Sequence, residues 1–463
     1  MMKSQMVTIF LLVALSTGIA ACDFEKSNEN NINNVNNINN SNNINNVNNL
    51  NNLNNINNTN NVINACAAPP RALWNYDLTV MPPSNVQIPS TCRGQGEFIY
   101  VYVADDAWTD GTVDASMVEN VVAAWETGVY KSMPSDVRMP VPPAYGIYGD
   151  VTAMLGNPPD VDADPHVIVF ISKLGSYNGT NFDGYFRREN QVAGPASNLA
   201  EMIYLDCEHH APDSDYLLGV LAHEFTHMIA YGLDSSEEGW LDEVFAQASM
   251  VVSGYWSDLS AGASYLATQT ATRPLVVADV RDFNYGAGFL FASWVLDLYA
   301  GSFFGGLIAD PADGEASFNT ALEAVAGAGV DIYDLILDWA AAGLLQDGSI
   351  GDGRYDYNTL GAAVGTPPVT TVTPGAAVTV NLPLSAYKYY RYGVTANQEV
   401  TVTSADDGVM RMLAIFQGGG VTQLLPLLII GGEGHLTTPE WDGAWTLVVV
   451  RTSGAGNVSF TVQ

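Results

Sequence analysis

Positive charge is scarce in this chain. Its 463 residues include only 16 lysines and arginines against 49 aspartates and glutamates, so the formal net charge is −33. A surface of this sign repels nucleic-acid phosphates and anionic lipid headgroups, and we expect neither as a direct partner. The net charge alone does not indicate the class of substrate. The length of the chain allows two or three domains with a sizeable hydrophobic core.

Long apolar runs are also missing, apart from residues 7–19 near the N-terminus, which are too few for a confident membrane span. A short charged start with Lys3 precedes this run, and Ile19-Ala20-Ala21-Cys22 follows it. The tetrapeptide resembles a bacterial lipobox, which implies a signal peptide over residues 1–21 and a lipid on Cys22. The alternative is ordinary cleavage near Ala21, which leaves Cys22 a plain cysteine.

Residues 28–64 repeat the unit Asn-Asn-x, within a segment 22–65 that separates the export signal from the rest of the chain. A period of three fits neither a strand nor an α-helix. We interpret the segment as a disordered, uncharged tether. A small stacked structure with asparagine ladders is the alternative.

Cysteine is rare, with four in the whole chain. Cys66 and Cys92 flank a proline-rich segment, and in an exported protein their pairing is the natural prediction. Cys207 is then the odd thiol, within Asp206-Cys207-Glu208-His209-His210. We interpret that cluster as an exposed loop rather than a second metal site.

The residues His223-Glu224-Phe225-Thr226-His227 read H-E-x-x-H. On a helix, histidines at i and i+4 lie on one face and can reach one zinc ion. Glu224 is then placed to act on water held by the metal. A catalytic zinc site needs a third protein ligand, and Glu243 is our choice. The alternative is a helix whose histidines have this spacing by chance.

The flanking residues predict the helix that this motif needs. Ser214 is a good N-cap, Asp215 suits the first turn, and Gly232 is a fitting stop. Apolar residues follow at helical spacing, namely Leu217, Leu218, Leu221, Phe225, Met228 and Ile229. A second helix that contains Trp240 and Phe245 would turn Glu243 inward.

Three stretches together resemble the hyicolysin family of zinc metallopeptidases, in the gluzincin group: residues 201–206, 221–229 and 240–243. The resemblance extends from about residue 100 to 345 and implies a mixed sheet with a helical lower lobe. It also implies zinc held by His223, His227 and Glu243. Two residues depart from the expected pattern: Asp242 stands where Asn is usual, and Gln247 where related enzymes carry an Asp that orients a zinc histidine.

Two further functional sites are predicted on less specific sequence patterns. Asp160, Asp162 and Asp164 alternate before an apolar run, as in loops that wrap Ca²⁺, but the rest of the EF-hand pattern is missing. A solvated acidic turn is the alternative. Tyr285, at the start of a predicted helix, is our candidate for stabilising the oxyanion of peptide hydrolysis. It could equally be a tyrosine that packs at a helix start.

We expect an α+β metallopeptidase domain over residues 66–365 and a small all-β sandwich over 366–463, where short β-rich runs alternate with turns. Tyr387, Tyr389, Tyr390 and Tyr392 crowd one of these runs, either as a contact surface or as a strand that packs rings on both faces. The whole predicts a monomeric zinc endopeptidase, exported and lipid-anchored, that acts on proteins or peptides. The alternative function is a non-catalytic surface lipoprotein, an adhesin or binding module that keeps a peptidase-like fold.

Overall fold

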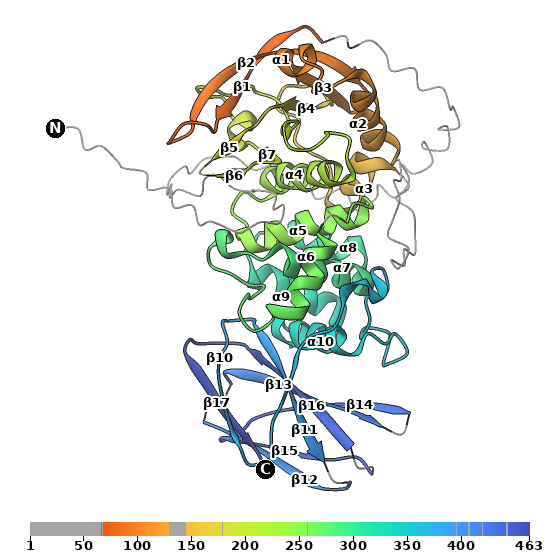
Figure 1. The fold of residues 1–463 in the computed structure, drawn as a ribbon, viewed down its shortest axis with the longest axis vertical. Helices are drawn as coiled ribbons and strands as arrows, with labels where there is room; N and C mark the ends of the chain where they lie inside the picture. Colours follow the sequence, from red (N-terminus) through yellow and green to blue (C-terminus); the bar gives the residue numbers. More distant parts are fainter. Residues whose placement is uncertain are drawn as a thin grey trace, which may run out of the picture.

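The computed structural model describes residue 66 and residues 68–463, except 129–144, 178, 257, 395, 406–407, 419 and 441–442. Figure 1 shows three stacked parts: a sheet with covering helices, a helical lobe and an all-β region. The fold is mixed α+β, as predicted. The lipobox with Cys22 and the Asn-rich segment lie outside the described residues.

The first part is a six-stranded sheet of order β1-β2-β3-β4-β8-β7. Neighbours pair antiparallel except β3 with β4 and β4 with β8, which are parallel. All six residues of β4 are buried, which explains its unbroken apolar sequence. The strands are β1 (Arg71–Asp77), β2 (Ser84–Gln95), β3 (Ile99–Ala104), β4 (Val167–Ser172), β7 (Gly184–Phe186) and β8 (Met202–Asp206); β5 (Ser176–Tyr177) and β6 (Thr180–Asn181) form a separate pair.

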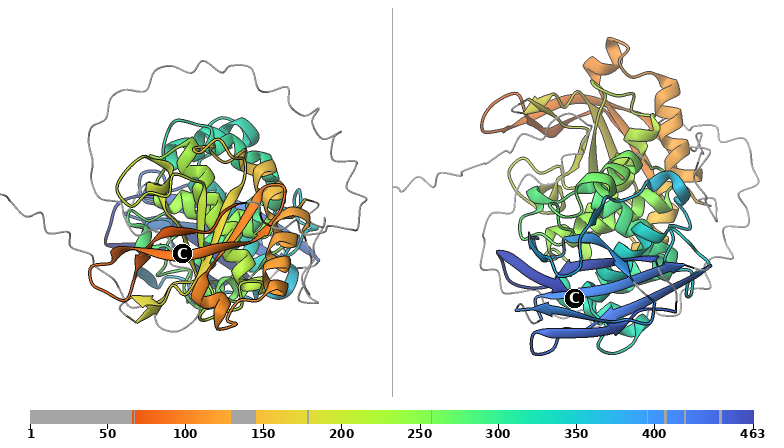
Figure 2. Two further views of the ribbon diagram at one scale, coloured as in Figure 1. Left: turned by 90° about the horizontal axis from the view of Figure 1, so that it is seen from above. Right: turned by 60° about the horizontal axis from the view of Figure 1, so that its bottom comes forward.

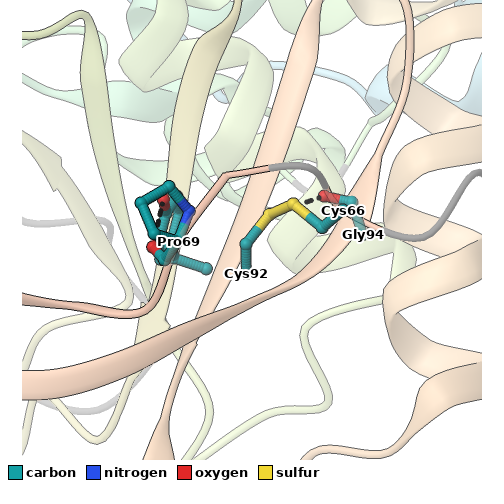
Figure 3. The surroundings of a disulfide bond; sticks show 5 residues. Cys66, Pro69, Cys92 and Gly94 are labelled. Atoms are coloured by element: carbon teal, nitrogen blue, oxygen red, sulfur yellow. Dashed lines mark hydrogen bonds between the residues drawn. A yellow bond between two sulfur atoms is a disulfide. The ribbon is translucent and has the colours of Figure 1, made fainter.

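The predicted disulfide between Cys66 and Cys92 is confirmed, with the two Cα atoms 5.8 Å apart (Figure 3). The segment between them forms the β1–β2 hairpin. Nearby, Tyr102 on β3 donates a hydrogen bond of 3.1 Å to the carbonyl oxygen of Pro69. The disulfide therefore ties the start of the described chain to the sheet.

Four helices pack on or beside this sheet: α1 (Asp105–Thr109), α2 (Ala115–Thr127), α3 (Gly146–Leu155) and α4 (Asp215–Leu233). The Asp114 side chain caps α2, and Gly128 ends it in a left-handed conformation. Helix α2 therefore stops at Thr127, because Gly128 adopts a backbone conformation that a helix cannot continue. Helix α4 packs against β7 and β8.

The helical lobe follows α4 in the chain. It contains α5 (Gly239–Val252), α6 (Leu259–Thr268), α7 (Tyr285–Tyr299), α8 (Gly301–Ile308), α9 (Glu315–Ala326) and α10 (Ile332–Leu345). Short 3-10 turns lie at Val280–Asp282, before α7, and at Gly361–Val364, after α10; a third, at Arg188–Gln191, joins β7 to β8 in the sheet. Among the described residues, no single helix is long and apolar enough to cross a membrane. Helices α7 and α8 pass that test only as a pair, which is bent by 106°.

The last part contains two sheets, of orders β14-β13-β16-β11-β9 and β10-β17-β12-β15. Apolar side chains from both sheets form one core between them, as expected for a two-layer β fold. The strands are β9 (Val369–Thr371), β10 (Ala377–Asn381), β11 (Tyr387–Val394), β12 (Glu399–Ser404), β13 (Met410–Gly418), β14 (Val421–Leu427), β15 (Glu433–Thr437), β16 (Gly443–Arg451) and β17 (Asn457–Val462).

The all-β region packs directly on the helical lobe (Figure 2, right). Tyr387 and Tyr389 of β11 join the core of the helices, and Tyr389 donates a hydrogen bond of 2.8 Å to the carbonyl oxygen of Ala340. Tyr390 and Tyr392 point the other way, into the core between the two sheets. The strand thus packs its rings on both faces, and all four tyrosines are buried.

Candidate metal centre

Helix α4 carries the H-E-x-x-H motif and is the expected helix. Its N-cap Ser214 accepts a hydrogen bond of 3.3 Å from the backbone of Leu217. The predicted stop at Gly232 is wrong, because the helix continues to Leu233. Gly232 serves packing instead: a Cβ there would lie 3.2 Å from Pro159.

Helix α5 brings Glu243 to the two histidines. Its carboxylate oxygen Oε2 lies 3.2 Å from Nε2 of His223 and 3.9 Å from Nε2 of His227. Trp240, one turn earlier, is fully buried, and its indole N–H donates a hydrogen bond of 2.7 Å to Glu238. The buried apolar face of α5 therefore fixes the direction in which Glu243 points.

The donor atoms of this centre fit a zinc ion. One ligand atom from each of His223, His227 and Glu243 lies within 4.8 Å of the other two. Nε2 of His227 and Oε2 of Glu243 are buried and have no hydrogen-bond partner among the described residues. Two imidazoles and one carboxylate are a known zinc ligand set, and buried polar atoms left without partners are costly. A cation at their meeting point would satisfy them.

The charges at the centre are strongly perturbed. Burial and, to a smaller extent, the charge of the neighbouring His227 lower the pKa of His223 to about 4. Burial also lowers the pKa of His227, but the charges of Asp242 and Glu243 outweigh it and raise that pKa well above its usual value. Burial raises the pKa of Glu243 to about 7. Such displaced values in one buried cluster are typical of functional sites.

His227 has a carboxylate on the side of its ring that faces away from Glu243. Asp242 Oδ2 lies 3.0 Å from Nδ1 of His227. Asp258, which precedes α6, acts on His223 through its negative charge, which opposes the effect of burial on the pKa of that histidine. A carboxylate in the position of Asp242 orients a metal-binding imidazole and raises its basicity. Sequence reasoning missed Asp258, which carries no motif and lies fifteen residues beyond Glu243.

Glu224 is buried, and one of its oxygens accepts a hydrogen bond of 2.9 Å from the backbone N–H of Phe186. Phe186 belongs to β7, the last strand of the sheet. Gly184 allows β7 to approach α4, because a Cβ there would lie 2.7 Å from Val220 and 3.6 Å from the Glu224 side chain. The edge of the sheet therefore lies directly beside the candidate base.

Tyr285 also reaches the centre. It is the first residue of α7, after the N-cap Asn284, and its hydroxyl donates a hydrogen bond of 3.3 Å to Oε1 of Glu243. Its ring centroid lies 6.1 Å from that of His223. The next residue must be glycine, since a Cβ at Gly286 would lie 2.3 Å from the carbonyl oxygen of Ala261 on α6. This close contact of α6 with α7 places Tyr285.

The three aspartates considered as calcium ligands do not all lie together. Asp164 does not join Asp160 and Asp162: one of its oxygens contacts the imidazole of His166 instead. The carboxylate that lies with Asp160 and Asp162 is that of Glu201.

The cluster around Cys207 also forms a possible ligand group, made of Asp206, Glu208 and His209. Asp206 is fully buried and already accepts hydrogen bonds from the backbone of Leu174, Glu208 and His209. Glu208 and His209 are exposed, as predicted for a loop, but Cys207 is buried. Burial raises the pKa of the Cys207 thiol to about 12, which makes it a poor nucleophile and metal ligand.

No protein-family model matches this chain, and no curated protein matches it either. Among solved structures, the pre-peptidase C-terminal domain of a Bacillus anthracis collagenase is 11% identical, with a TM-score of 0.18 over 21% of this chain and 95% of that domain. The lysozyme inhibitor PliG of Salmonella Typhimurium is 18% identical, with a TM-score of 0.17 over 20% and 97%. The GH115 glucuronidase BtGH115A is 8% identical, with a TM-score of 0.13 over 66% and 53%. Likenesses this low carry no argument about fold or function.

Proposed function

We propose that this chain is a zinc-dependent endopeptidase of the gluzincin type. One observation carries the proposal: two buried imidazoles and a buried carboxylate converge on one point, with Glu224 next to the first histidine on α4. His223, His227 and Glu243 would hold the ion. The H-E-x-x-H motif on a helix with a downstream glutamate is the arrangement on which the hyicolysin resemblance rests.

Bound zinc would supply a Lewis acid that polarises the scissile carbonyl and makes water nucleophilic near neutral pH. Glu224 takes the proton from the attacking water and passes it to the leaving amine. Its hydrogen bond with Phe186 keeps the carboxylate in place between proton transfers. Tyr285 donates a hydrogen bond to the oxyanion that forms as the carbonyl is attacked.

The substrate is a protein or peptide. Strand β7 ends the sheet beside Glu224, so an extended peptide can pair along its outer edge with its scissile bond near the metal. An endopeptidase fits better than an aminopeptidase, because the sequence lacks a Gly-x-Met-Glu-Asn segment, which gluzincin aminopeptidases use to bind the free amine.

The N-terminal sequence supports an exported, lipid-anchored enzyme. A lipid on Cys22 would hold the chain at the cell envelope, and the Asn-rich segment would separate the enzyme from the membrane. The all-β region would serve as an accessory domain of this monomer.

The deciding experiment measures zinc content and casein cleavage of purified protein in parallel, with and without a chelator. We expect one zinc per chain and cleavage that the chelator abolishes and added zinc restores. Glu224→Gln should keep the zinc and lose nearly all activity, because the amide cannot accept the water's proton. Glu243→Ala should lose the zinc itself. A Glu224→Gln variant with most of its activity would reject the mechanism.

A non-catalytic binding module is the second candidate, since a long tether and an acidic surface suit a surface lipoprotein. The complete set of His223, Glu224, His227 and Glu243 favours the enzyme, because a module without catalysis has no need for Glu224. Correctly folded protein with neither zinc nor cleavage would favour the binding module.

A further inference from the structure

A second cluster of carboxylates lies at the sheet edge formed by the amino ends of β4 and β8. Asp160 and Asp162 lie on the connection between α3 and β4, and Glu201 directly precedes β8. Because β4 and β8 are parallel neighbours, their first residues meet at this edge, where Ile168 donates a backbone hydrogen bond of 2.7 Å to Glu201. One oxygen from each of the three carboxylates lies within 4.8 Å of the others.

Glu201 distinguishes this cluster from an ordinary acidic turn. Its side chain is only 1% exposed. One oxygen accepts a hydrogen bond from the backbone N–H of Val161, in the loop between the two aspartates. The other oxygen is buried and has no hydrogen-bond partner among the described residues. A buried carboxylate oxygen beside two further carboxylates is strongly unfavourable unless a cation compensates it.

The pKa shifts of these carboxyl groups show that their negative charges are poorly compensated by the protein itself. Burial raises the pKa of Glu201, and the charges of Asp162 and Asp160 raise it further, against the hydrogen bond from Val161. Burial also raises the pKa of Asp162, where Arg71 provides only partial compensation. Asp164 is engaged elsewhere: it contacts His166, whose ring stacks on Tyr100 at a centroid distance of 4.1 Å.

We propose that Asp160, Asp162 and Glu201 form a calcium site, separate from the zinc centre and independent of the proposed catalysis. All three donors are oxygens, which suits a hard cation and disfavours zinc. Asp160 and Asp162 are exposed, so water can complete a shell of six to eight oxygens. Calcium accepts such an irregular shell, whereas Mg²⁺ demands nearly ideal octahedral geometry.

The position of the site suggests its effect. The same connection carries Pro159, which packs against Gly232 near the end of α4. A cation that joins Asp160 and Asp162 to Glu201 would fasten this connection to β8. It would thereby support the far end of the helix that carries His223 and His227. Calcium should therefore stabilise the folded enzyme without taking part in hydrolysis.

The test is thermal unfolding of the full chain, freed of divalent ions and resupplied with zinc, at increasing CaCl₂ and, separately, MgCl₂ of equal ionic strength. We expect a saturable rise in the midpoint with calcium and little with magnesium, because a ligand that binds only the folded state stabilises it. Calorimetric titration should count one tightly bound calcium per chain. No calcium-dependent rise and no bound calcium would overturn the proposal.

Substitutions of single residues test which side chains bind the calcium ion. Glu201→Gln and Asp160→Asn should each weaken calcium binding by about tenfold or more, because affinity depends on the number of charged ligands. Asp164→Asn, in the same loop but outside the cluster, should keep the calcium-dependent rise. If Glu201→Gln does not fold, calcium binding by Asp160→Asn, a change at an exposed residue, is the deciding measurement. Calcium binding that survives Asp160→Asn undiminished would refute the site.

Discussion

Oδ2 of Asp242 lies 3.0 Å from Nδ1 of His227, on the side of the imidazole opposite the nitrogen that faces Glu243. The position directly before the third ligand, where the family resemblance implied asparagine, thus carries a charged partner for a metal-binding histidine. The carboxylate selects the tautomer in which Nδ1 carries the proton and Nε2 is free to bind the metal.

Asp242→Asn should weaken zinc binding by about 10- to 100-fold, because the neutral amide no longer raises the basicity of His227. Competition with a chromogenic zinc chelator measures the change. Glu119→Gln, an exposed change on α2, is the matched control and should leave zinc affinity unaltered. Equal affinity in Asp242→Asn and wild type would show that the charge has no such role.

Asp258→Asn should affect zinc binding through His223. The charge of Asp258 opposes the lowered pKa of His223, so its loss should reduce the basicity of that ligand and weaken zinc binding by about tenfold. The double variant with Asp242→Asn tests whether the two charges act independently, because both aspartates act on His223. Losses in zinc-binding free energy that do not simply add are expected for residues in one such cluster. An unchanged zinc affinity in Asp258→Asn would count against this residue.

Tyr285→Phe removes one hydroxyl beside the metal centre. If the hydroxyl stabilises the oxyanion, kcat should fall by roughly 100-fold while the zinc content stays at one per chain. KM should change little, because the interaction forms mainly in the transition state. Loss of zinc with the hydroxyl would instead mean that Tyr285 serves to hold Glu243, with which it shares a hydrogen bond.

Glu237, in the turn before α5, gives the fold a pH dependence of its own. Burial raises its pKa to about 7, with the charges of Asp234 and Asp313 adding to the rise. The folded state then binds more protons than the unfolded state between about pH 4.5 and 7. This contribution to stability is complete below that window and is lost as the pH rises through 7.

Glu237→Gln should therefore raise the unfolding midpoint relative to wild type at pH 8 by a few degrees, and have little effect at pH 4.5. The amide oxygen can still accept the hydrogen bonds from the backbone of Glu238 and Gly314. Thermal unfolding at several pH values measures the difference, with Glu119→Gln as the control. A difference that does not grow with pH would contradict the raised pKa.

Local sequence signals predicted most of the elements near the centre. The N-cap at Ser214 and the apolar stripe of α4 are both present, and a second helix carries Trp240, Phe245 and Glu243. The prediction that the helix ends at Gly232 was wrong. Glycine occurs both at helix ends and at close contacts within a helix, and here Pro159 lies close to Gly232. Only the neighbour in space distinguishes the two uses.

What the sequence by itself determined is the chemistry within one helix: His223, Glu224 and His227 share a face because the α-helix has a fixed period. The tertiary structure alone decided which distant residues complete each site. It allowed the charge of Asp258 to act on His223 and grouped Glu201, rather than Asp164, with the carboxylates of Asp160 and Asp162. It also brought the Tyr285 hydroxyl within hydrogen-bond distance of Glu243. The physical reason is that burial and strand pairing join residues far apart in the chain, and no local pattern records those contacts.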